Sequence, residues 1–150
     1  MYMVYWLKPE VALHYFHKTD ILYRFFKAYQ EHTEHPDLAR QFKYITCPFS
    51  KQQLLHHIFQ QHNQLLNIRI EEQKIEIKQD GQAIFIYVSE HALSFFCDSL
   101  HVAENLLFPI LKTINPYLFV MSYHSDHYGW LMPMKENYLK NNRQLLYSYP

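Results

Sequence analysis

Apolar and polar residues follow two different periods along this chain, and the two periods predict a mixture of strands and helices. Residues 2–8 have the aromatic, strand-favouring composition of a first β-strand. Residues 10–17 follow Pro9 and predict a short helix, because proline is favoured in the first helical turn. In residues 21–31 the apolar side chains return on one face, which predicts an amphipathic helix capped by Asp20.

The next part of the chain contains one ambiguous segment and one clear helix. Residues 31–37 are polar and predict a connector, whereas residues 38–46 fit a helix and a strand about equally well. Ser50 and Gln53 have the spacing of a capping box, in which each residue satisfies a backbone N–H group at the start of a helix. We therefore predict a helix that begins there and reaches about His62.

The remaining part of the chain predicts several strands and one helix. The Asp80-Gly81 step is typical of a two-residue hairpin turn between alternating segments, and Pro109 should kink the helix that contains it. The predicted elements are strands at 67–72, 74–79, 83–90 and 116–124, a helix at 102–114, and a turn with a short final segment at 125–133, while residues 92–99 are a further, uncertain strand candidate.

This order of elements predicts an α/β (α+β) fold. We expect a single domain with a mixed, mainly antiparallel sheet of about five strands and with helices packed on it. Residues 1–139 should form the domain, and residues 140–150 should be a peripheral C-terminal tail.

Charge and composition narrow the classes of function. Lys and Arg together number 14, as do Asp and Glu, and the 11 histidines are mostly neutral at pH 7. Because nucleic-acid binders usually have a basic surface, direct DNA binding is not expected, and a DNA-binding repressor is a disfavoured alternative. The sequence has no signal peptide, no membrane-length apolar run and no disulfide pattern, which indicates the cytoplasm.

Catalytic and metal-binding signatures are weak. His124, Asp126 and His127 form a compact group that suggests an alternative metal-binding protein or metalloenzyme. Zinc needs three or four converging ligands, and a histidine-rich solvated surface is the simpler interpretation. Cys47 and Cys97 lie beside aromatic residues and are expected to be inert thiols. We therefore expect no catalysis, no cofactor and no metal.

The first helix has more apolar surface than a small domain needs to bury. Residues i and i+4 share a helix face, so Ala12 and Phe16 form one stripe, while Val11 and Tyr15 form the adjacent stripe. If Ala12 and Phe16 hold the helix on the core, Val11 and Tyr15 should be exposed.

Three short motifs give the sequence a resemblance to a known family. They are Lys8, Glu10, Ala12, His14, Tyr15 and Phe16; Gln41, Tyr44, Ile45, Thr46 and Pro48; and Ser125, Tyr128, Gly129, Trp130, Leu131, Pro133, Lys135 and Glu136. In order and spacing they resemble the SirA family, the sporulation inhibitors of replication of endospore-forming bacteria. The resemblance extends over about residues 3–138.

The resemblance implies a non-catalytic protein with a compact α/β fold. Such proteins bind the N-terminal domain of the replication initiator DnaA and prevent initiation when a cell commits to sporulation, which implies a monomer in a 1:1 complex. The partner-binding residues implied by the motifs are Val11, His14, Tyr15, Gln41 and Tyr44.

One of these residues departs from the family pattern. Val11 stands where the family has a phenylalanine anchor, and a valine buries less apolar area. The difference corresponds to about 1 kcal/mol of contact energy. The resemblance thus singles out Val11 as the weak point of the implied interface.

Overall fold

A seven-stranded antiparallel sheet organises the protein, which a computed structural model describes over residues 1–61 and 67–132. The strand order is β2-β3-β4-β5-β1-β6-β7. The described strands are β1 (Tyr2–Trp6), β2 (Asn67–Ile70), β3 (Lys74–Gln79), β4 (Gln82–Val88), β5 (Leu93–Cys97), β6 (Leu118–Ser122) and β7 (Tyr128–Trp130). The described helices are α1 (Pro9–Tyr15), α2 (Thr19–Glu31), α3 (Pro36–Ile45), α4 (Lys51–Gln61), α5 (Leu100–Leu106) and α6 (Phe108–Ile114).

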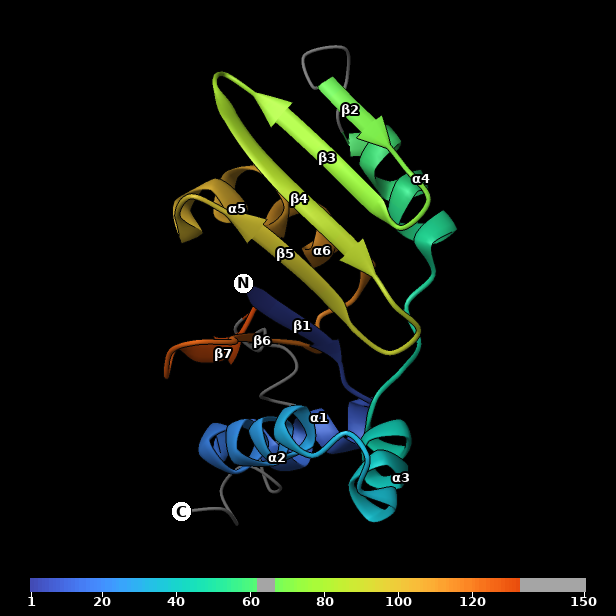
Figure 1. Cartoon of the computed structure of the whole chain (residues 1–150), viewed down its shortest axis with the longest axis vertical. Coiled ribbons are helices and arrows are strands. Elements are labelled where there is room, and N and C mark those ends of the chain that lie inside the picture. The colour runs from blue at the N-terminus through green and yellow to red at the C-terminus, as the bar shows by residue number, and fades with distance from the viewer. Residues whose placement is uncertain (62–66, 133–150) are drawn as a thin grey trace, which may run out of the picture.

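The helices form two groups that cover different parts of the sheet. Helices α4, α5 and α6 lie behind β2–β5 in Figure 1, while α1, α2 and α3 gather at the end of the sheet formed by β1, β6 and β7. Successive strand residues point to opposite faces. Accordingly, Val4 of β1 enters the core under α4–α6, and its neighbour Tyr5 enters the core under α1–α3.

The α+β class is confirmed, and the sheet has more strands than the five or so expected. Two short segments account for the difference. Residues 92–99, an uncertain strand in the sequence, contribute β5. The predicted turn at 125–133 contains β7, whose three residues are too few to show an alternating pattern.

Local packing decides the segment that fitted both a helix and a strand. Residues 36–45 form α3, with Pro36 in its first turn. Phe42 of this helix is buried, stacks on Tyr29 with ring centres 4.0 Å apart, and meets the ring of Tyr5 edge-on at 5.7 Å. A helix places Leu38, Phe42 and Ile45 on one inward side, a spacing that a strand would not give.

Two predictions about helix termini need correction, and one is confirmed. Asp20 does not cap α2: the helix begins at Thr19, so Asp20 lies in its first turn and pairs with Arg24. The single helix predicted at 102–114 is two helices that meet at Leu107. The capping contact at α4 is present, since the N–H of Gln53 donates to Oγ of Ser50 over 3.2 Å. The predicted end at His62 lies outside the described residues.

The predicted hairpin turn is confirmed. Asp80 and Gly81 have φ angles of 51° and 77°, both in the left-handed region, as a tight turn between β3 and β4 requires. Within the described residues, no helix is long and apolar enough to cross a membrane.

Candidate functional site

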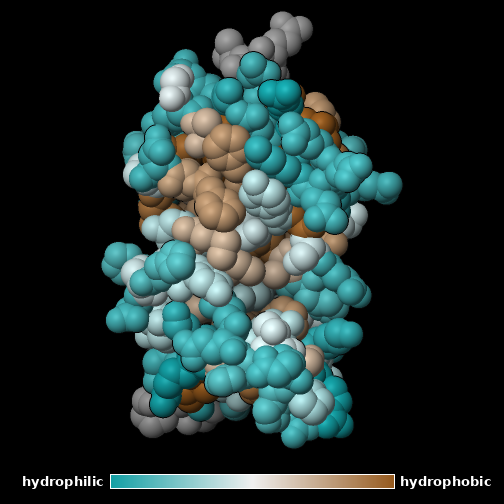
Figure 2. Space-filling model, viewed as in Figure 1, coloured by the Kyte–Doolittle hydropathy of each residue, from teal (hydrophilic) through white to brown (hydrophobic). Residues whose placement is uncertain are grey.

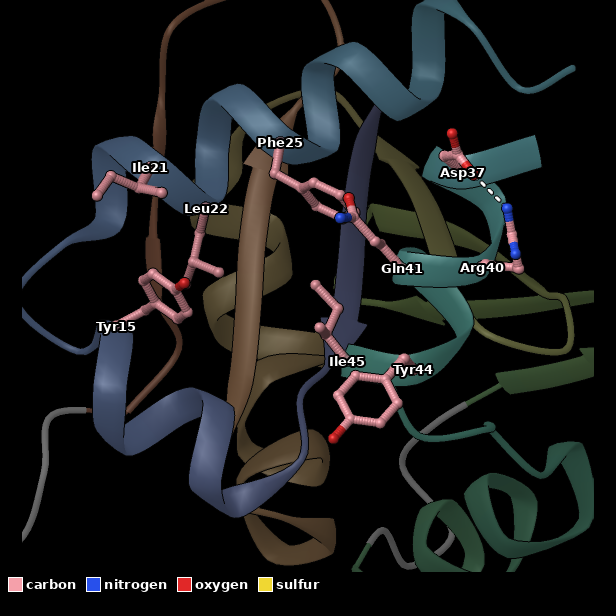
Figure 3. Close-up of a pocket in the computed structure, with 9 residues that line it drawn as sticks. All are labelled: Tyr15, Ile21, Leu22, Phe25, Asp37, Arg40, Gln41, Tyr44 and Ile45. Atoms are coloured by element: carbon pink, nitrogen blue, oxygen red, sulfur yellow. Dashed lines mark hydrogen bonds and ion pairs between the residues drawn. The ribbon is translucent and has the colours of Figure 1, made fainter. Parts of the chain in front are cut away.

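Helices α1, α2 and α3 enclose an open groove of about 770 Å³ (Figure 3). Its lining is mainly apolar at the bottom and polar at the α3 side. The lining residues are Tyr15, Ile21, Leu22, Phe25, Asp37, Arg40, Gln41, Tyr44 and Ile45. A groove with an apolar floor and a polar rim is suited to receive a side chain or a helix of another protein.

Helix α2 supplies the apolar floor because it has two apolar stripes. Leu22 and Phe26 are buried and hold α2 on the core. Ile21 and Phe25 are spaced i, i+4, so they form the next stripe, and both line the groove. Ile21 is one of the exposed large apolar side chains of the protein.

Helix α3 supplies the polar rim. With Phe42 fixed in the core, the adjacent positions Gln41, Tyr44 and Ile45 line the groove. In Figure 3, the Gln41 side chain extends toward Phe25, and Asp37 pairs with Arg40 at the outer end of the helix.

The end of α3 is held by a short chain of hydrogen bonds. Oγ1 of Thr46 donates to the carbonyl oxygen of Phe42 over 2.6 Å, and Nδ1 of His91 lies 2.9 Å from the same hydroxyl. The N–H of Lys8 donates to the carbonyl oxygen of Ile45 over 3.0 Å. This last bond ties the start of α1 to the end of α3, so the two sides of the groove are mutually positioned.

Three of the five predicted partner-binding residues lie together in this groove. Tyr15 comes from α1, while Gln41 and Tyr44 come from α3, about 26 residues further along the chain. Tyr15 is half-buried, Gln41 is exposed, and Tyr44 has 71% of its surface exposed. Nζ of Lys8 lies 4.4 Å from the centre of the Tyr44 ring, a cation–π contact.

The expected exposure of Val11 is wrong. Val11 is only 9% exposed and packs with Ala12 in the core under α1–α3. The buried arc of α1 is centred between Val11 and Ala12, so it includes one residue from each predicted stripe. Periodicity identifies stripes but does not fix the rotation of a helix on its core, and this rotation separates Val11 from the half-buried Tyr15.

His14 and Phe16 lie outside the groove lining. His14 is exposed, and its ring meets that of Tyr15 edge-on at 4.6 Å. Phe16 is half-buried and stacks on Trp130 with ring centres 5.5 Å apart. Nε1–H of Trp130 donates to the carbonyl oxygen of Phe16 over 2.9 Å, which anchors the end of α1 to β7.

The sequence interpretation missed the contribution of α2 to the groove. It assigned the apolar residues of that helix to an ordinary core face. The second stripe formed by Ile21 and Phe25 is the same kind of surplus that marked the first helix, so this signal was available in the sequence.

The alternative metal site is not supported. Among residues 1–61 and 67–132, no group of three His, Cys, Asp or Glu side chains is placed to hold a metal ion. Oδ1 of Asp126 instead accepts a hydrogen bond from the Tyr23 hydroxyl over 3.0 Å. Burial raises the pKa of both the Cys47 and the Cys97 thiols, which lowers their thiolate fraction at neutral pH.

The fold and the groove together define a small α+β protein with an open groove between three helices. Comparison with known proteins identifies the family. The family described as "Sporulation inhibitor of replication protein SirA" matches residues 1–135, and the chain belongs to it. A curated relative of that name from Bacillus subtilis (strain 168) is 29% identical over 145 residues, which cover 90% of this chain and 95% of the relative. The resemblance seen in three sequence motifs is thereby confirmed.

Proposed function

We propose that the protein inhibits initiation of DNA replication during sporulation by binding the N-terminal domain of DnaA in the α1–α2–α3 groove. The family name supports the inhibition of replication. The observation that supports the site is the convergence of Tyr15, Gln41 and Tyr44, from two separate helices, on one open apolar groove.

Each part of the groove has a role in this proposal. Tyr15 and Tyr44 are amphipathic anchors that bury ring area and keep a hydroxyl group for hydrogen bonding. Gln41 supplies one donor and one acceptor that fix the orientation of the partner. The floor formed by Ile21 and Phe25 excludes water from these contacts.

The proposed mechanism is occlusion of a DnaA surface in a 1:1 complex in the cytoplasm. It requires no cofactor and no chemical step. Val11 contributes from beneath, by supporting α1 in the core, and His14 flanks Tyr15 at the edge of the surface.

The experiment is a titration of the purified protein with the N-terminal domain of DnaA from the same organism, in which calorimetry measures the binding. Tyr44→Ala should weaken binding at least about tenfold, because truncation of a central interface tyrosine typically costs more than 1 kcal/mol. Since Tyr44 is largely exposed, its truncation should leave the unfolding midpoint nearly unchanged.

Phe59→Ala serves as the matched control. Phe59 is an exposed aromatic residue on α4, outside the groove, so its truncation should leave the affinity for DnaA unchanged. Equal affinity of the wild type and the Tyr44→Ala and Tyr15→Ala variants, all folded, would contradict the proposed site. Absence of binding by the folded wild type would contradict the proposed partner.

A further inference from the structure

A second surface lies on the sheet, away from the groove. None of the described helices covers the face of β3, β4 and β5 that is turned to the viewer in Figure 1, and Figure 2 shows hydrophobic side chains gathered there over β4 and β5. The residues are Phe85, Tyr87 and Phe96. Phe85 and Phe96 are directly opposite one another in the β4–β5 ladder, and Tyr87 meets Phe96 edge-on at 5.7 Å. We call these three residues the aromatic strip.

Tyr87 and Phe96 of the strip are exposed and Phe85 is half-buried, although the opposite face of the same strands is buried. Ile84 and Ile86 alternate with the strip residues along β4 and are fully buried, whereas Phe96 is 42% exposed. Because the inward residues already supply the core, the outward aromatic residues are not needed to hold the strands on their helices. Adjacent exposed aromatic rings of this kind are typical of a binding surface.

Accessible positive charge borders the strip. The outward positions of β2 and β3 carry Arg69, Lys74 and Lys78, and a single carboxylate, Glu76. The Arg69 side chain is 73% exposed, but that of Glu76 is only 11% exposed and pairs with Lys78 over 3.0 Å. Arg69 also faces Glu71 at the strand end, with Nε and Oε1 3.7 Å apart. Three cations against two carboxylates leave this face with an excess of one positive charge, because Arg69 and Lys78 are each paired with a carboxylate.

One cation is placed directly on the strip. Nζ of Lys74 lies 4.6 Å from the centre of the Phe85 ring. A ligand that packs on the neighbouring rings of Tyr87 and Phe96 would thus bring its own negative charge within reach of Lys74. A ligand made of planar groups joined by regularly spaced negative charges would fit this arrangement of aromatic rings and nearby cations.

We propose that the aromatic strip binds single-stranded nucleic acid, with bases stacked on exposed rings and phosphates near Arg69, Lys74 and Lys78. Open antiparallel sheets with outward aromatic residues bind single strands in this way, since every base has a face to stack. A second copy of the chain is disfavoured as the binding partner, because the cations beside its strip would face the cations beside this one. A duplex is also disfavoured, because its bases are already stacked on one another and offer no free face to the rings.

The number of cations limits the electrostatic part of binding. Neutralisation of three phosphates on a single strand predicts that the logarithm of the association constant falls by about 2 for each tenfold rise in salt. Binding should therefore be weak and should depend on stacking as much as on charge. The dependence of binding on stacking distinguishes the strip from a surface that binds through positive charge alone.

In the test, the full chain is added to a fluorescent twenty-nucleotide oligothymidylate in low salt at pH 7.5. Fluorescence anisotropy measures the binding. The wild type should bind the oligonucleotide. Phe96→Thr and Tyr87→Thr, which keep strand-forming side chains, should each weaken binding at least about fivefold. Lys74→Gln should weaken binding and reduce the salt slope by about 0.7.

Phe59→Ala is again the control, because it removes an exposed phenylalanine from α4 without altering the strip. Circular dichroism of each variant establishes that it is folded. Three results would overturn the proposal: no binding by the wild type, binding that the two threonine variants leave unchanged, or equally strong competition by polyglutamate. The last result would show that the strip recognises an acidic polypeptide instead. None of them bears on DnaA binding, which uses different elements.

Discussion

Val11 supports the groove between α1, α2 and α3 from the core, although it does not line the groove. The resemblance places it at the partner interface, yet it is buried in the core with Ala12 and lies below Tyr15. A substitution at this position therefore changes the support of α1 and not a contact on the surface of the groove.

This distinction predicts the effect of Val11→Ala. The substitution should lower the free energy of unfolding by about 2 kcal/mol, because it removes two buried methyl groups and leaves a small cavity. Urea unfolding of Val11→Ala is compared with that of Tyr44→Ala. The free energy of unfolding should fall little in Tyr44→Ala, because Tyr44 is largely exposed. An unchanged urea midpoint for Val11→Ala would contradict the burial of Val11 in the core.

Tyr5 has a different role, at the centre of the core under α1–α3. It is almost fully buried, stacks on Phe26 with ring centres 4.0 Å apart, and accepts a hydrogen bond from Nε2 of Gln30 over 2.8 Å. Burial raises the pKa of the Tyr5 hydroxyl well above its usual range, because a charged phenolate would be poorly solvated there.

The raised pKa predicts a loss of stability in alkali. The folded state binds the Tyr5 proton more tightly than the unfolded state, so this contribution is complete below about pH 10 and declines as the pH rises further. Between pH 9 and pH 11, Tyr5→Phe should make the alkaline decline shallower by about 0.7 kcal/mol per pH unit on average, because the unfolded tyrosine is half ionised near pH 10. Urea unfolding of both proteins between pH 9 and pH 11 measures the slopes, and parallel slopes would contradict the assignment.

At the scale of elements, the sequence predicted most helices and strands, but not how the helices are rotated on the core. The β3–β4 hairpin followed from the Asp80-Gly81 step, because the turn chemistry is local. The helical structure of α3 depends on the packing of Phe42 against Tyr5 and Tyr29, which are distant from it in the sequence. The floor of the groove on α2 depends likewise on which of two stripes meets the sheet.

The hairpin offers a prediction with an internal control. Gly81 has a φ of 77°, which ordinary residues avoid, and Gly129 has no positive φ. An added Cβ at either glycine meets no atom within 4 Å other than those of its chain neighbours. Gly81→Ala should therefore destabilise the protein by about 1 kcal/mol through backbone strain alone, while Gly129→Ala should change stability by less than about 0.5 kcal/mol.

Thermal unfolding of the two variants checks this expectation. A loss for Gly129→Ala as large as that for Gly81→Ala would mean that the tight turn is not the reason for the glycine at position 81.

For the whole molecule, the class of fold was predictable and the strand order was not. Hairpin pairs such as β3–β4 are adjacent in the chain, so alternating patterns and a turn identify them. The strand pairs β1–β5 and β1–β6 join the two halves of the sheet, for example through Met3 with Ser94 and Met3 with Met121, and no local pattern specifies partners so far apart. The groove required the same long-range information, which the family motifs supplied for α1 and α3 but not for α2.

The central position of β1 affects how the protein is made. On the ribosome, β1 and helices α1–α3 are synthesised first, but the two neighbours of β1 in the sheet are β5 and β6, near the other end of the described chain. Helices α1–α3 pack on a face to which Phe119 and Met121 of β6 contribute. The residues of the groove are therefore synthesised early, but the face on which their helices pack is complete only after β6 has been synthesised, so we expect the groove to form late in folding. Contacts between such distant segments also slow folding, because a long loop must close first.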